Sequence, residues 1–121
     1  MSKLATDAMI DGGLDKMATC VTLTVCAGQP TSFANIAARK LAAVVIDSGD
    51  FSKANGDVSG RKLTVASQAD IPITGTGTQN GDHIVIDDGT DYVVTTSTSQ
   101  PLTNGGTVTT PAYDIEVTDP S

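Results

Sequence analysis

The sequence predicts a mainly β fold, either a small antiparallel β-sandwich or a barrel-like domain, with a helix at the N-terminus. Three observations favour this class. Apolar and polar residues alternate with a period of two from Thr19 onward, in about six or seven short runs with turn signals about every 8–12 residues. All but one of the 14 acidic residues are Asp, which favours turns, whereas Glu favours helix interiors. Thr is abundant, as expected for pleated surfaces.

Residues 3–17 carry the clearest helical pattern. Acidic residues recur at every fourth position and form a polar stripe: Asp7, Asp11 and Asp15. Apolar residues fall on another side: Ile10, Leu14 and Met17. Ser2 is the candidate N-cap, and the glycine pair at 12–13 weakens the helix by about 1 kcal/mol per residue. We therefore expect one domain over 1–121, with a helical segment at 1–18 and a β-rich body at 19–121.

The first half of the body contains two predicted strands and one ambiguous segment. "TCVTLTVCA" alternates and predicts a strand with one apolar face: Val21, Leu23 and Val25. "GQPTS" ends this strand. Residues 33–41, "FANIAARKL", fit either a short helix or an irregular loop. "AAVVID" then predicts a buried strand.

Residues 47–60 are predicted to form a long polar connection, with a turn signal at Asn55-Gly56. "RKLTVAS" follows as a strand with Leu63 and Val65 on one face. "DIPIT" adds another, which Pro72 restricts to a sheet edge or a strand end.

"GTGTQNGD", residues 75–82, begins like a phosphate-binding loop with its G-x-G. The third glycine position holds Asn80, and a strand pattern follows where a phosphate loop needs a helix N-terminus. We therefore interpret this segment as a hairpin loop.

The segment "GDHIVIDDGTDYVVTT", residues 81–96, holds the single histidine, His83, and four aspartates. "HIVI" and "YVVTT" predict two strands joined by a turn in which Asp88-Gly89 supplies the left-handed conformation. The spacing of a calcium loop is absent, one histidine does not make a zinc site, and no nucleophile motif accompanies it. We predict a hairpin with no catalytic, cofactor-binding or metal-binding residue.

Cys20 and Cys26 lie in "CVTLTVC". In one extended strand their separation would be about 20 Å, whereas a disulfide needs Cα atoms within about 7 Å. We expect two buried free thiols.

The C-terminal part begins with a turn-rich link, "SQPLTNGG", and ends with a strand in "TVTTPAYDIEVTDPS". Tyr113, Ile115 and Val117 alternate with polar residues, which predicts one dry face and one wet face. Pro111 and Pro120 bracket this strand and favour an edge position.

Composition excludes several classes of function. The two Phe and two Tyr residues, without Trp, predict a core of small aliphatic side chains, for which oligomerisation is a common remedy. The net charge of −7 disfavours nucleic acid as a partner. No signal peptide and no run of about 20 apolar residues is visible, so we expect a protein made in the cytoplasm without a membrane partner.

Three segments of the sequence resemble small virion proteins of tailed bacteriophages: "LATDAMIDGGLDKMATCVTLTVCAGQPTSF", "SGDFSKANGDVSGRKLTV" and "HIVIDDGTDYVVTTSTSQPLTNGGTVTTPAYDIEVTDP". The likeness covers nearly the whole chain. Its most specific parts are "SGDF…GDVSGRKLTV" and "VTTSTSQPLT…PAYDIE". Among such proteins the chain is most similar to head decoration (cement) proteins, which bind the outer capsid lattice, commonly as trimers.

The resemblance implies a viral structural protein on the outer capsid surface, with the major capsid protein and itself, as a homotrimer, for partners. It implies no catalytic residue and no cofactor. The first alternative is a tail or head–tail component of the virion. The second is a small carbohydrate- or ligand-binding β-module, which would need exposed aromatic residues. An enzyme is disfavoured because no nucleophile–base pair is visible.

Overall fold

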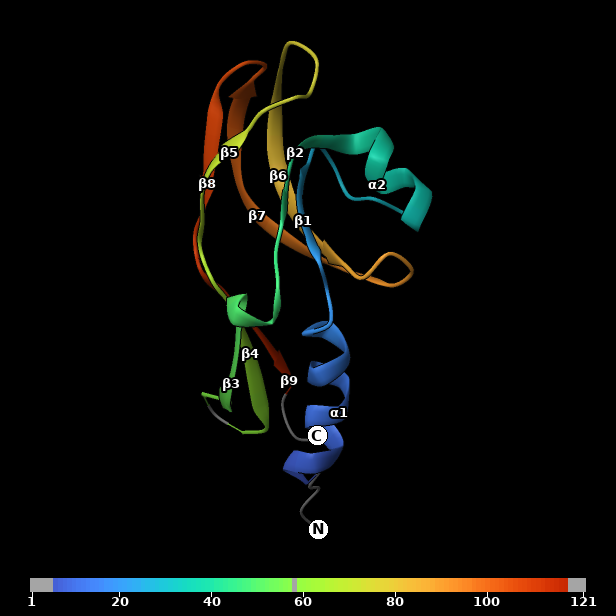
Figure 1. Cartoon of the computed structure of the whole chain (residues 1–121), viewed down its shortest axis with the longest axis vertical. Helices are drawn as coiled ribbons and strands as arrows, with labels where there is room; N and C mark the ends of the chain where they lie inside the picture. The colour runs from blue at the N-terminus through green and yellow to red at the C-terminus, as the bar shows by residue number, and fades with distance from the viewer. Residues whose placement is uncertain (1–5, 58, 118–121) are drawn as a thin grey trace.

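A computed structural model of the chain describes residues 6–57 and 59–117 (Figure 1). The model is mainly β, with 53% strand and 18% helix, which confirms the predicted class and its N-terminal helix. The elements follow in the order α1 (Asp7–Met17), β1 (Thr22–Cys26), α2 (Phe33–Arg39), β2 (Lys40–Val45), η1 (Ser48–Asp50), β3 (Phe51–Asn55), β4 (Arg61–Val65), β5 (Gln68–Pro72), β6 (Thr78–Asp87), β7 (Tyr92–Thr103), β8 (Thr107–Thr110) and β9 (Tyr113–Val117).

The strands form three antiparallel sheets that pack together. Their strand orders are β2-β1-β6-β7, β3-β4-β9 and β5-β8. Each order has two ends, so none of these sheets closes on itself. The molecule is elongated: the four-stranded and two-stranded sheets occupy one end, and the three-stranded sheet lies beside α1 at the other (Figure 1).

The main core joins all three sheets. Leu23 of β1, Val65 of β4 and Ile71 of β5 belong to one buried cluster. Partly buried Phe51 and Tyr113 pack against it. Its fully buried members are aliphatic, as the scarcity of aromatic residues predicts. This core supplies hydrophobic burial mainly through many medium-sized side chains of roughly 1.5–3 kcal/mol each.

A second, smaller cluster holds α1 on the three-stranded sheet. Ile10 and Leu14 pack against Leu63 of β4, as their predicted apolar face requires. The polar stripe of α1 is not simply solvated, however. Asp11 accepts a hydrogen bond from Arg61 Nε at 2.9 Å, and Lys53 Nζ pairs with Asp15. Asp11 and Asp15 of the stripe therefore lie against the basic side chains of β3 and β4, which sequence periodicity alone does not reveal.

The predicted start of the helix, at residue 3, lies outside the described residues. α1 begins at Asp7 with Thr6 at the N-cap position, and the Thr6 side chain makes no capping hydrogen bond. The predicted cap, Ser2, lies outside the described residues.

The predicted single apolar face of β1 is also wrong. Val21 precedes the strand and is 47% exposed, whereas Thr24 and Cys26 are buried together with Leu23 and Val25. The reason is that α2 covers the second face of the four-stranded sheet, where Ile36 packs with Cys26. The segment 33–41 thus adopts the helical alternative. The strand predicted from "AAVVID" is β2, but its end, Val45, is 81% exposed.

Three predicted loops contain regular structure. Residues 47–60 include η1, capped reciprocally by Asp47 and Asp50, and β3. The link "SQPLTNGG" is largely the second half of β7. The segment 75–82 is not a hairpin loop, because it connects β5 to β6, which lie in different sheets. With these additions the described chain has nine strands, more than the sequence predicts.

The remaining strand predictions are confirmed. Leu63 and Val65 are both fully buried on one face of β4. Pro72 ends β5, in a sheet of two strands. β9 is an edge strand paired with β4, with Tyr113 opposite Val65.

Candidate functional site

The Asp-rich turn at 87–91 closes a hairpin between β6 and β7, as predicted, with Asp87 opposite Tyr92. Asp88 Oδ1 accepts hydrogen bonds from the backbone N–H groups of Thr90, at 2.9 Å, and Asp91, at 2.8 Å. Gly89 has φ +95°, a conformation that side-chain-bearing residues rarely adopt. The turn therefore uses its aspartate to satisfy its own backbone.

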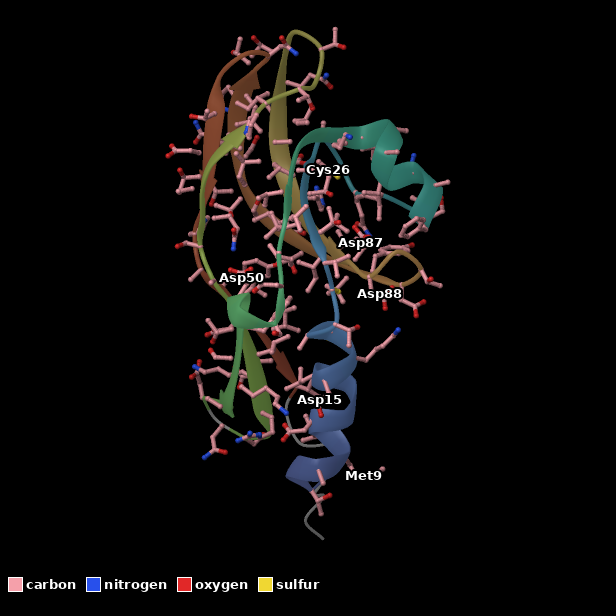
Figure 2. The ribbon with its side chains drawn as sticks, in the orientation of Figure 1. Met9, Asp15, Cys26, Asp50, Asp87 and Asp88 are labelled. Atoms are coloured by element: carbon pink, nitrogen blue, oxygen red, sulfur yellow. The ribbon has the colours of Figure 1, made fainter. Side chains whose placement is uncertain are left out.

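The same turn anchors the C-terminal end of α1. Lys16 Nζ donates a hydrogen bond to Asp88 Oδ2 at 2.6 Å and lies 3.5 Å from Asp91 Oδ2. The hydrogen bond from Lys16, followed by those from the two backbone N–H groups, holds the pKa of Asp88 well below its usual range. Asp87 and Asp88 both lie at this hairpin, beside the end of α1 (Figure 2). These carboxylates are structural anchors in the geometry observed.

His83 lies near the middle of β6, beside an irregularity in the pairing of β6 with β7. Its Nδ1 is 2.7 Å from Asp82 Oδ1, which also accepts a hydrogen bond from the Gly28 N–H at 2.8 Å. The hydrogen bond with His83, followed by that from Gly28, lowers the pKa of Asp82. Asp82 thereby links the irregular part of β6 to the loop after β1.

Cys26 is the register partner of His83 on β1. The thiol of Cys26, the imidazole of His83 and the carboxylate of Asp82 therefore lie on neighbouring backbone positions. The sequence does not indicate this proximity, because Cys26 and His83 are far apart in the chain. The Cys26 side chain is fully buried, and its Sγ faces the Ile36 carbonyl oxygen at 4.0 Å. Burial raises the pKa of this thiol to about 11, which leaves it overwhelmingly protonated at neutral pH.

Cys20 is also buried, and both cysteines are free thiols, as predicted. Within residues 6–57 and 59–117, no group of three or more His, Cys, Asp or Glu side chains could hold a metal ion. The structure thus brings the three turn aspartates together at one end of the hairpin, whereas His83 lies farther along β6, near the middle of the ladder.

A cavity of about 520 Å³ opens between β7 and β8. Buried apolar side chains form its inner wall: Val25, Ile84 and Leu102. Ser97, Thr98 and Thr109 are among its polar lining residues, and no lining residue is charged or aromatic. We refer to it as the β7–β8 groove.

Gly81 lines the β7–β8 groove and packs closely against two of its apolar side chains. A Cβ at this position would lie 2.8 Å from both Leu102 Cδ1 and Val25 Cγ1, so only glycine permits this packing without a shift. This groove was not predicted from the sequence. The signal that could have found it is the absence of any charged residue between Asp91 and Asp114.

No family model, curated protein or solved structure matches the chain. No helix within the described residues is long and apolar enough to cross a membrane.

Proposed function

We propose that this protein is a decoration protein of a tailed-bacteriophage head, which binds the outer surface of the capsid as a homotrimer and strengthens it. It is made in the host cytoplasm and acts in the virion, with the major capsid protein as its partner. The proposal rests first on the sequence resemblance described above. The two most specific segments of that resemblance contain β4 and β9, which pair with each other in the three-stranded sheet.

The arrangement at this end of the molecule supports the proposal. We expect the amphipathic N-terminal segment, residues 3–17, and the connection at residues 47–60 to contact the capsid. These two segments lie close together, because Lys53 of β3 pairs with Asp15 of α1. Met9 projects from α1 away from β3 and β4 (Figure 2) and is 78% exposed. An exposed apolar side chain on a short helix is well placed to contact a partner.

Charge and mode of binding favour the outer surface of the head. A net charge of −7 would be repelled by packaged DNA inside. A decoration subunit spread over several capsid subunits gains affinity by multivalency. Because it binds the assembled shell and not free subunits, it would stabilise that shell by mass action.

The β7–β8 groove favours a second candidate, a small ligand-binding β-module. Its volume of about 520 Å³ lies within the range of small-molecule sites, which is about 300–1,000 Å³. Carbohydrate recognition, however, commonly uses an aromatic platform, and the groove has none. We therefore rank this candidate below the decoration protein.

The proposal can be tested by adding the purified protein to phage heads that lack it. We expect regular density on the head surface by cryo-electron microscopy and a higher temperature of head disruption. Met9→Asp should weaken head binding, because it places a charge on the contact face of α1. Asp at this position in the first helical turn is otherwise favourable to the helix. Val45→Asp, at a site 81% exposed on β2, is the matched control and should bind as the wild type does.

Two outcomes would contradict this proposal. Density confined to tails would favour the tail or head–tail component. Failure to bind either heads or tails, together with saturable binding of a small molecule in the β7–β8 groove, would favour the ligand-binding module.

A further inference from the structure

Residues 92–113 contain no charged side chain, although 17% of the whole chain is charged. This range covers all of β7, the turn that follows it, and all of β8. The two strands form the two sides of the β7–β8 groove. Both strands that flank the groove are therefore uncharged along their whole length.

The other edge strands of the three sheets differ from β7 and β8 in their charge. Every other edge strand carries an exposed charge: Lys40 on β2, Lys53 on β3, Asp70 on β5, and Asp114 and Glu116 on β9. Charged side chains on an edge discourage pairing with another chain, because they would be desolvated or placed beside like charges. β7 and β8 are the two edge strands without this protection.

Both unprotected strands also have an unpaired edge. Among the described residues, β7 pairs with β6 alone and β8 with β5 alone. The open edges flank a groove whose inner wall consists of buried apolar residues, including Ile84 and Leu102. A partner at this position would bury apolar surface and satisfy free backbone groups at the same time.

We infer that the uncharged β7–β8 side, residues 92–113, is the surface at which a second copy of this chain binds. Two copies with a net charge of −7 repel each other, and they can approach most closely where neither carries charge. Thr and Ser side chains, abundant on β7, form favourable cross-strand pairs with one another. A strongly charged partner would gain no electrostatic attraction from this surface.

The shape of β7 favours a closed assembly over a growing fibre. Gly81 pairs with Gln100 and His83 with Thr96, so residues 97–99 lie opposite Asp82 alone and form a bulge. Pro101 also lacks the backbone N–H of a continuous ladder. These features shorten the stretch of β7 that can pair, which limits open-ended strand addition.

This inference rests on the proposed function in its expectation that the chain acts as an oligomer, but its test uses the free protein. Sedimentation equilibrium of the purified wild type should show a trimer, the oligomer that the proposed function expects. A dimer would support this surface and contradict the proposed homotrimer. Thr98→Asp and Thr98→Lys each place a charge in the β7–β8 groove and should weaken association by about tenfold or more. Thr107→Asp, on β8, gives a second position.

Two control variants make the test specific. Thr98→Ser keeps the hydroxyl and should associate as the wild type does. Ser52→Asp adds the same charge to an exposed residue of β3 and should also leave association unchanged. Circular dichroism of each variant confirms that it is folded.

A wild-type protein that stays monomeric at high micromolar concentration would overturn the inference, as would equal weakening by Ser52→Asp and Thr98→Asp. A monomer that still binds heads would contradict this surface and the proposed homotrimer, and it would leave only the head-binding part of the proposed function intact. An oligomer that dissociates on Thr98→Asp but binds no heads would support this surface and contradict the proposed function.

Discussion

Truncating Leu14 to alanine should weaken the packing of α1 on the three-stranded sheet. It should lower the free energy of unfolding more than the substitution of any exposed residue on the same helix. Leu14 is fully buried and packs in a cluster with Ile10 and Leu63. The substitution removes three carbon atoms, worth about 0.8 kcal/mol each in transfer free energy. The cavity left behind adds a further cost, and Leu→Ala changes in cores total about 2–5 kcal/mol. We expect a loss of about 3 kcal/mol in the free energy of unfolding.

The matched control is Met9→Ala, five residues earlier on the same helix and 78% exposed. It should change the free energy of unfolding by no more than about 0.5 kcal/mol. Urea denaturation followed by far-ultraviolet circular dichroism measures both variants, and hydrogen exchange of the α1 amides shows where Leu14→Ala acts. A loss below about 1 kcal/mol for Leu14→Ala, or equal losses for the two variants, would refute the packing of α1 on β4.

Two further predictions concern the cysteines and the anchor of α1. Burial raises the pKa of Cys20 and of Cys26 to about 11, so a thiol reagent should react slowly with the folded protein. After denaturation without reductant, the same reagent should detect two free thiols per chain. Rapid reaction in the folded state would contradict the burial of these thiols. The lowered pKa of Asp88 contributes stability that is present above its unfolded pKa of about 4 and is lost as pH falls toward its folded pKa. Asp88→Asn should therefore lower the free energy of unfolding at pH 6, and its difference from the wild type should shrink below about pH 4. A difference that stays the same in acid would count against the ion pair between Lys16 and Asp88. Asp91→Asn serves as a comparison.

Local signals predicted the elements that depend on local chemistry. The Asp88-Gly89 turn needs a left-handed residue and a short acceptor side chain, and both requirements are visible in the sequence. β4 was predictable because Leu63 and Val65 alternate with polar residues. The presence of α1 followed from a pattern with the helical period, although its first residue did not.

Elements that depend on distant partners were not predictable in the same way. Four of the five β3 residues are exposed, so no apolar alternation marks the strand, and its pairing with β4 defines it. The second half of β7 is rich in Ser and Thr and pairs with residues 78–81, which read as a loop. The second buried face of β1 depends on α2, whose position a sequence pattern does not give. The β7–β8 groove combines β7 and β8 with the inner side of β1 and β6, so no single motif marks it.

The pairing of β4 with β9 has a consequence for how the chain is completed during translation. β4 ends at Val65, and its partner begins only at Tyr113. Until the ribosome releases that later segment, β4 lacks one neighbouring strand. The cluster in which α1 packs against Leu63 also lacks Ile115 until then. The packing of α1, the first helix to be synthesised, is therefore complete only after β9, the last strand described, has been synthesised. Such a long loop closure slows folding, since its entropy is lost before the contacts that compensate for it can form.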